Sequence, residues 1–265
     1  MNPLTVGFIM FECERIRYPF REAVRSAAYH ADEVLVAVCD EETKASLLEL
    51  DEPKLRLLDA EWPTAKDGGT ERVQQRLATR LLDECKSEWF FYGNADECLA
   101  EWSLWSLDVL REERIHYGRA LYQHFLGDFD TTFPFIYDRV VRLIRKGAKG
   151  QWTNDACSWV VPEGERVADL PVLVNHYGKV SLGREREAAQ KEMEFFDLYR
   201  NSGTIAEYDP ATIALLQERP GWLDYKQQVK RKCELEGKPD ESKPFRGRHP
   251  QVMQAYMERM TGHVG

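Results

Sequence analysis

The chain has 265 residues, of which 43% are hydrophobic and 31% are charged, and its formal net charge is −9. This length suits one large domain, or one domain with an extension. The acidic balance disfavours broad, sequence-independent binding to nucleic acid or to an anionic membrane, although it leaves room for a local basic groove.

The N-terminal apolar run, 6–11, is too short to cross a bilayer. No basic segment precedes this run, so we expect neither a membrane span nor a secretory signal. The six cysteines are scattered and form no Cys-x-x-Cys pair. This spacing is poor evidence for a zinc site or a disulfide framework, and it favours a reducing, cytoplasmic location.

Strands and helices are expected to alternate over the first hundred residues. The run 34–38 is continuously apolar, as is typical of a buried parallel strand. Apolar residues recur every four positions from Val73 to Cys85, which predicts an amphipathic helix. We expect strands over 5–11, 34–38, 55–58 and 89–92, and helices over 18–30, 44–50 and 70–85. This alternation predicts a mostly parallel, Rossmann-like sheet.

The pattern loosens after residue 100. We expect helices over 101–113 and 184–200, strands over 115–125 and 140–144, and a short apolar run over 172–175. From residue 201 the chain becomes more polar, and its last segment carries apolar residues at helical spacing. We therefore divide the chain into a main domain, 1–200, and a C-terminal helical extension, 201–265, packed on it.

The stretch 89–97 is the most informative, because an aromatic, apolar run ends abruptly in Asn94, Asp96 and Glu97. In an open α/β sheet, ligands bind just beyond the carboxyl ends of the strands. A carboxylate there can hold a divalent cation, which can in turn hold a diphosphate. The alternative for Asp96 is a helix cap. Asp32 stands in a second Ala-Asp-Glu tripeptide, but it precedes a strand, so we expect it in a solvated turn at the opposite edge.

Two further residues follow predicted strands. His176 comes directly after the run 172–175 and is the natural second ligand, since imidazole suits Mn²⁺ better than Mg²⁺. A hydrogen-bonded structural histidine is the alternative. Asp40 follows the predicted strand 34–38, where a carboxylate can accept hydrogen bonds from a ribose or a base. Capping of the next helix is an equal alternative for Asp40.

Asp155 lies between Trp152 and Trp159. Apolar surroundings raise the pKa of a carboxyl group and suit a general base, and indole faces pack well on sugar rings. The residues alone nevertheless favour a structural loop with two core tryptophans. Arg142 belongs to a basic run, 139–146, on a predicted strand. Because alternate side chains of a strand share a face, this run either neutralises a diphosphate or is merely solvated.

Taken together, these stretches resemble a GT-A glycosyltransferase of the family-2 type. The matching stretches follow the order of that family: 31–36 with 40–43, 89–97, 142–147, 175–178, 191–192 and 247–250. The resemblance implies a Rossmann-like GT-A fold and the transfer of a sugar from a nucleotide-sugar donor to an acceptor hydroxyl, by an inverting displacement. The acceptor itself stays open.

By position, the resemblance implies that Asp40 contacts the nucleoside, and that Asp96 and His176 bind Mn²⁺ or Mg²⁺. Asn94 stands where the family usually has Asp, so replacing it by Asp is expected to tighten metal binding. Asp155 becomes the candidate base. The next candidates for the base are Asp128, Asp130 and Asp138. The resemblance gives the basic run with Arg142 a role beside the donor.

Two other functions remain open at this stage. A nucleotidyltransferase uses a similar sheet and metal, but it would favour a glycine-rich, basic loop after the first strand, whereas 11–15 is acidic and lacks glycine. A sugar- or nucleotide-binding module that has lost catalysis is the non-enzymatic alternative, and Asn94 is the residue that favours it.

Overall fold

The structure, a computed structural model, describes residues 3–62, 73–101, 103, 114–133, 139–153, 156–180, 182 and 243–262. The helix expected over 184–200, nearly all of the helix expected over 101–113, and residues 201–242 of the C-terminal extension lie outside these ranges. Within the described residues, no helix has both the length and the apolar character needed to cross a membrane.

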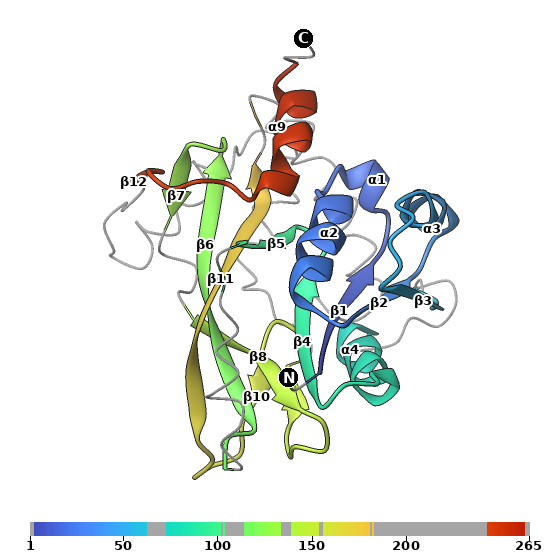
Figure 1. The fold of residues 1–265 in the computed structure, drawn as a ribbon, viewed down its shortest axis with the longest axis vertical. Coiled ribbons are helices and arrows are strands. Elements are labelled where there is room, and N and C mark those ends of the chain that lie inside the picture. Colours follow the sequence, from blue (N-terminus) through green and yellow to red (C-terminus); the bar gives the residue numbers. More distant parts are fainter. Residues whose placement is uncertain are drawn as a thin grey trace, which may run out of the picture.

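Four parallel strands form the half of the sheet that the first hundred residues build (Figure 1). Their order is β3-β2-β1-β4, where β1 is Leu4–Met10, β2 is Glu33–Val38, β3 is Leu55–Asp59 and β4 is Trp89–Asn94. The helices that follow β1, β2 and β3 are α1 (Cys13–Ile16) with α2 (Phe20–His30), α3 (Glu41–Leu48) and α4 (Val73–Glu84). This order and alternation confirm the predicted Rossmann-like sheet.

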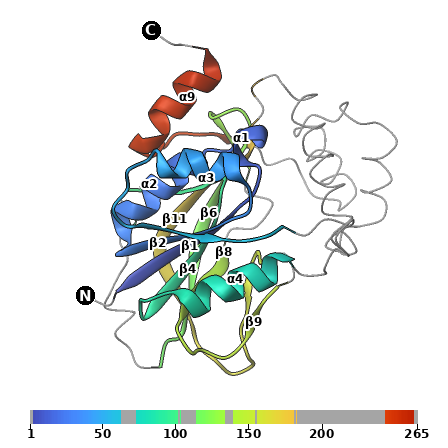
Figure 2. The ribbon, with the colours of Figure 1, turned by 90° about the vertical axis from the view of Figure 1, so that its right-hand side faces the viewer.

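Helices cover both faces of the parallel half (Figure 2). Because successive side chains of a strand point to opposite faces, β2 divides its residues between two cores. Val34 and Val36 pack into the cluster that contains α2, whereas Leu35 and Ala37 pack into the cluster that contains α4. With both faces buried, the carboxyl ends of the strands are the place where polar groups can gather.

The other half of the sheet is mixed. β6 (Tyr117–Gly127), β8 (Arg139–Arg145) and β11 (Val167–Val180) extend it beyond β4, with β8 antiparallel to both β4 and β6, and β11 parallel to β6. β11 has 14 residues, far more than the apolar run expected over 172–175. Pro171 has no N–H and cannot donate a hydrogen bond to the neighbouring strand. The strand continues past Pro171 because its pairing with β6 is irregular between Asp169 and Leu173, so that no such bond is needed there.

Several short strands were not predicted from the sequence. They are β5 (Glu97–Leu99), β7 (Thr131–Phe133), the separate pair β9 (Gln151–Trp152) and β10 (Trp159–Val160), and β12 (Lys243–Pro244). Strands of two or three residues are too short to show a period of alternation, so only their partners in space define them.

The described end of the C-terminal extension packs against α2. It contains η3 (Gln251–Met253) and α9 (Gln254–Thr261). Met253 and Tyr256 are buried in the same hydrophobic cluster as α2. The Tyr256 hydroxyl donates a hydrogen bond to the Arg17 carbonyl at 2.7 Å, and Arg259 forms a 3.0 Å ion pair with the buried Glu22. This end therefore shares the core of the main domain.

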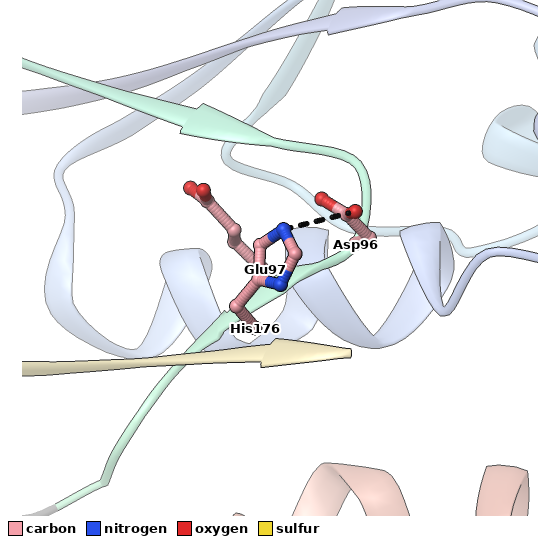
Figure 3. Close-up of side chains that lie close together, drawn as sticks. All are labelled: Asp96, Glu97 and His176. Atoms are coloured by element: carbon pink, nitrogen blue, oxygen red, sulfur yellow. Dashed lines mark ion pairs between the residues drawn. The ribbon is translucent and has the colours of Figure 1, made fainter. Parts of the chain in front are cut away.

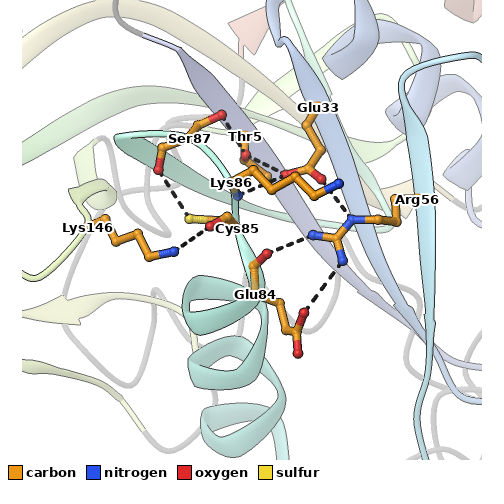
Figure 4. Close-up of polar contacts among 8 residues, drawn as sticks. All are labelled: Thr5, Glu33, Arg56, Glu84, Cys85, Lys86, Ser87 and Lys146. Atoms are coloured by element: carbon orange, nitrogen blue, oxygen red, sulfur yellow. Dashed lines mark hydrogen bonds and ion pairs between the residues drawn. The ribbon is translucent and has the colours of Figure 1, made fainter.

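A polar network ties the amino-terminal edge of the sheet together (Figure 4). Glu33 accepts hydrogen bonds from the Thr5 hydroxyl at 2.9 Å and from Arg56 Nε at 2.8 Å. Lys146 Nζ donates to the Cys85 carbonyl at 2.6 Å, just past the end of α4. Asp32 lies at the same edge, where its carboxylate accepts the Leu4 N–H at 2.9 Å. The tripeptide with Asp32 is thus held by hydrogen bonds at the edge predicted for it.

Candidate metal centre

Asp96 and His176 meet beyond the carboxyl end of β4 (Figure 3). Asp96 lies in the turn between β4 and β5, and β5 pairs antiparallel with β11 so that Glu97 stands opposite His176. His176 Nε2 lies 3.4 Å from Asp96 Oδ2. The ligand atoms of Asp96, Glu97 and His176 all lie within 4.8 Å of one another. The structure therefore brings together the two residues that the sequence placed in a metal site.

A close backbone approach shapes this site. The pairing of β11 with β6 is irregular between His176 and Lys179, and the Tyr177 N–H donates to the Asp96 carbonyl at 2.9 Å. A Cβ at Gly178 would lie 2.0 Å from Asp96 Oδ2 and 3.1 Å from His176 Cε1. Bulges often redirect side chains beside active sites, and here the bulge makes room for a carboxylate that any side chain would displace.

Glu97 is buried and is held by four hydrogen-bond donors. The Asn94 N–H donates to Oε2 at 3.0 Å and the Asn94 side-chain amide donates to Oε1 at 2.9 Å. The Tyr122 hydroxyl lies 3.5 Å from Oε2, and Arg142 Nη2 lies 3.3 Å from Oε1. Sequence reasoning assigned no role to Glu97, although it stands three residues after Asn94 in the same stretch.

Arg142 is the buried cation of the site. Its side chain is fully buried, and its guanidinium carbon lies 5.2 Å from the ring centroid of Tyr92 and 5.7 Å from that of Tyr122. In this geometry Arg142 acts on the site through Glu97. Arg145 and Lys146, from the same basic run, instead contact Glu88 and the Cys85 carbonyl at the amino-terminal edge of the sheet. A role for Arg142 beside the donor phosphates stays a prediction.

Asp40 lies at the same edge of the sheet as Asp96. Its Oδ2 accepts the Glu12 N–H at 2.7 Å, and its Oδ1 accepts the Thr43 N–H at 2.8 Å as the N-cap of α3. Asp40 thus fixes the chain that leaves β1 and the helix that follows β2, as the capping alternative proposed. Contact between Asp40 and a nucleoside stays a prediction.

The pKa of the buried Cys13 thiol is affected by the carboxylates at this edge. Burial raises the pKa of its thiol well above the ordinary value. The negative charges of Asp40 and Asp96 raise the pKa further. Both carboxylates therefore lie close enough to this buried thiol to act on its pKa.

A second histidine lies beside His176. His124 of β6 stands opposite His176 in the register of β6 and β11, and the two ring centroids are 4.9 Å apart. His124 is buried. The sequence offered no context that distinguished His124, because only the pairing of β6 with β11 places it at the site.

Asp155, the candidate base, lies outside the described residues, as does Asp138. The two neighbouring tryptophans are described: Trp152 and Trp159 are buried in the cluster that contains α4, with ring centroids 5.1 Å apart. They are core residues, as the structural alternative proposed, and their faces are covered by protein. Asp128 and Asp130, two of the next candidates for the base, are described: the Asp128 carboxylate accepts the Asp130 N–H at 3.1 Å in the turn after β6.

The residues present fit a divalent cation. One carboxylate oxygen and one imidazole nitrogen lie 3.4 Å apart, and the Asp96 carboxylate lies where a side chain at Gly178 would otherwise be. Carboxylate and imidazole together suit Mn²⁺, whereas Mg²⁺ prefers oxygen ligands alone. His176 Nδ1 is buried and makes no hydrogen bond to another described residue.

Comparisons with known proteins assign no family. No model of a known protein family matches the chain, and no curated protein matches it. Among solved structures, the chain is similar to S. aureus TarS 1-349, with 11% identity, a TM-score of 0.42, and coverage of 79% of this chain and 76% of that chain. The complex of TarS 1-349 with UDP gives 10% identity, a TM-score of 0.39 and the same coverage.

The complex of TarS 1-349 with UDP-GlcNAc gives 16% identity and a TM-score of 0.33, covering 46% of this chain and 34% of that chain. This chain thus spans about a third of the length of that structure. Similarity at this level shows neither a family nor an activity, and the function must be inferred from the geometry of the site itself.

Proposed function

We propose that this protein is a metal-dependent GT-A glycosyltransferase that moves a sugar from a nucleotide-sugar donor to an acceptor hydroxyl, with inversion at the sugar. The observation that carries the proposal is the meeting of Asp96 and His176, 3.4 Å apart, beyond the carboxyl end of β4. Ligands of open α/β sheets bind at this edge. A carboxylate and an imidazole at this place suit an ion that holds a diphosphate.

The proposed roles of Asp96 and His176 follow from the positions of their side chains, whereas the proposed role of Asp155 comes from the resemblance alone. Asp96 Oδ2 and His176 Nε2 would hold Mn²⁺ or Mg²⁺, with Mn²⁺ favoured by the imidazole. When bound, the ion supplies electrostatic stabilisation of the departing nucleoside diphosphate. Asp40 is proposed to contact the nucleoside, because it follows β2 at the same edge of the sheet as Asp96. Asp155 stays the proposed base that takes the proton of the acceptor hydroxyl.

The described cysteines support a reducing compartment, which agrees with a proposed cytoplasmic location. Cys13, Cys39, Cys85, Cys98 and Cys157 are all free thiols in the described part of the chain. A nucleotide-sugar donor is the proposed small-molecule partner, and the acceptor remains to be found.

One observation favours a second function, a nucleotide-binding module without catalysis. Asn94 and Glu97 are hydrogen-bonded to each other, so neither side chain is directed at the proposed ion. Such a module would bind a nucleoside diphosphate with Mn²⁺ but would neither transfer nor hydrolyse the sugar.

A screen of nucleotide sugars tests both functions. We would measure the thermal stability of the protein with each nucleotide sugar, with and without Mn²⁺, and then the hydrolysis of those that stabilise it. Stabilisation that needs Mn²⁺, together with slow hydrolysis, supports the glycosyltransferase. Binding without hydrolysis or transfer supports the module, and the absence of any Mn²⁺-dependent binding overturns both. Asp96→Asn is the negative control, because it keeps the shape of the side chain and removes its charge.

A further inference from the structure

We propose that Glu97 is not a ligand of the ion but one half of a buried ion pair with Arg142, which holds the Asn94–Asp96 turn and cancels a charge beside the site. This inference rests on the proposed function, since it concerns the same metal centre. It makes Glu97 and Arg142 positioning residues, and it reduces the three-residue cluster to a site with two protein ligands.

The Glu97 carboxylate is fully used by hydrogen bonds within the protein. Oε1 accepts from the Asn94 side-chain amide and from Arg142 Nη2, at 2.9 and 3.3 Å. Oε2 accepts from the Asn94 N–H at 3.0 Å and lies 3.5 Å from the Tyr122 hydroxyl. A carboxylate offers about four acceptor positions, so all of those on Glu97 are used. Ligation of an ion by Glu97 would have to break bonds to a buried cation.

Glu97 and Arg142 are both buried and neutralise each other. The Glu97 side chain is 1% exposed and the Arg142 side chain is 0% exposed. Two charges this deeply buried persist only when they are paired, and Arg142 is further covered by the rings of Tyr92 and Tyr122. Because Asn94 donates two bonds to Glu97, the pair fixes the end of β4, from which the turn with Asp96 begins.

The charge balance gives the pair its functional consequence. Arg142 cancels the charge of Glu97, so the site presents the ion with the charge of Asp96 alone. A divalent ion held this way keeps net positive charge, which attracts a diphosphate. If Glu97 were an unpaired second carboxylate, the ion would bind more tightly and attract the diphosphate less.

A double-mutant cycle on Glu97 and Arg142 tests this role. We would measure by calorimetry the affinity for Mn²⁺ alone, and then the affinity of the Mn²⁺-saturated protein for inorganic pyrophosphate. Three variants would be compared: Arg142→Met, Glu97→Gln and the double variant. Work at pH 8 keeps the measurement far above the ordinary range of carboxyl titration.

We expect Arg142→Met to raise Mn²⁺ affinity roughly tenfold and to lower pyrophosphate affinity by a similar factor, because it leaves a negative charge uncancelled. Glu97→Gln should change both affinities in the opposite directions, because the guanidinium keeps its charge. A merely structural role would lower both affinities in both variants. Opposite signs for the two ligands therefore identify an effect of charge.

The double variant keeps the test decisive if a single variant fails to fold, because it buries no unpaired charge. We expect its affinities for Mn²⁺ and pyrophosphate to lie within about threefold of the unaltered protein, since both charges are removed together and the amide oxygen introduced by Glu97→Gln can still accept the Asn94 N–H that holds the turn. A loss of Mn²⁺ affinity of roughly tenfold or more in a folded double variant would show that Glu97 does more for ion binding than balance the charge of Arg142, and would overturn this inference alone. Failure of the unaltered protein to bind Mn²⁺ would instead overturn the proposed metal site and, with it, the role of the pair.

Discussion

The carboxylate of Asp96 occupies the space that a side chain at Gly178 would need. A Cβ at Gly178 would lie 2.0 Å from Asp96 Oδ2, far inside any permitted contact. Asp96 lies in the turn between β4 and β5, and Gly178 lies in β11. The hydrogen bond from the Tyr177 N–H to the Asp96 carbonyl holds these two segments together. The glycine is therefore part of the site, although it offers no ligand atom.

The substitution Gly178→Ala should displace the Asp96 carboxylate while leaving most of the fold intact. We expect Mn²⁺ affinity to fall roughly tenfold or more, as is common when the orientation of a ligand is lost. Calorimetry with Mn²⁺ measures this effect. Gly147→Ala is a matched control: its φ of +85° makes alanine strained, by about 1 kcal/mol, but nothing lies within 4 Å of the added Cβ. Equal Mn²⁺ affinities in the two variants would contradict the role of Gly178.

The two Ala-Asp-Glu tripeptides provide a test of position in the sheet. Asp96→Asn should weaken Mn²⁺ binding roughly a hundredfold, because an ion with few protein ligands loses its charged one. Asp32→Asn should leave Mn²⁺ affinity unchanged, because Asp32 binds the Leu4 N–H at the opposite edge and an amide oxygen still accepts that bond. Titrations with Mn²⁺ measure the affinity of each folded variant. A similar loss in the two would refute the assignment of the site to the carboxyl edge.

The structure changes the expected outcome of Asn94→Asp. The sequence comparison alone predicts tighter metal binding, but the Asn94 amide lies 2.9 Å from Glu97 Oε1. Two carboxyl groups at this distance share a proton, so the site gains little charge. We expect Mn²⁺ affinity to change by less than about threefold, and the free energy of unfolding to fall by about 2 kcal/mol. Urea unfolding and calorimetry measure these effects, and a clear gain in Mn²⁺ affinity would place the side chain toward the ion.

Glu33 gives a prediction of pH dependence at the other edge of the sheet. Burial by itself raises the pKa of Glu33, but hydrogen bonds from Arg56, Thr5 and the Lys86 N–H outweigh it, so the pKa lies below the ordinary value of 4.5. A depressed carboxyl pKa stabilises the fold above the unfolded-state pKa, and this contribution is lost as the pH falls through the folded-state pKa.

We therefore expect the free energy of unfolding to decrease as the pH falls below about 4.5, and to decrease less steeply in Glu33→Gln. Urea unfolding between pH 3 and pH 7 measures both slopes. Glu41→Gln, at a side chain that is 94% exposed, controls for the loss of one charge. If Glu33→Gln and the unaltered protein lose stability in parallel over this range, the network around Glu33 is not coupled to its ionisation.

Most of the parallel half of the sheet could be read from the sequence, because its signals are local. The run 34–38 is buried throughout, as its continuous apolar character predicted, and β4 begins at Trp89 as expected. The position of Asp96 followed from the same logic, since it comes directly after a buried strand. The length of β11 could not be predicted from the sequence, because Pro171 and Gly178 interrupt its run of strand-forming residues. Only its pairing with β6 keeps this segment extended.

The sequence by itself determined the order of strands and helices in the first hundred residues, the edge at which Asp96 lies, and the acidic balance of the chain. Each of these depends on neighbouring residues or on composition. Only the tertiary structure decided that Glu97 faces Arg142, that Gly178 makes room for Asp96, and that His124 stands beside His176. These relationships join residues that lie far apart in the sequence, and the pairing register that creates them depends on packing across the whole sheet.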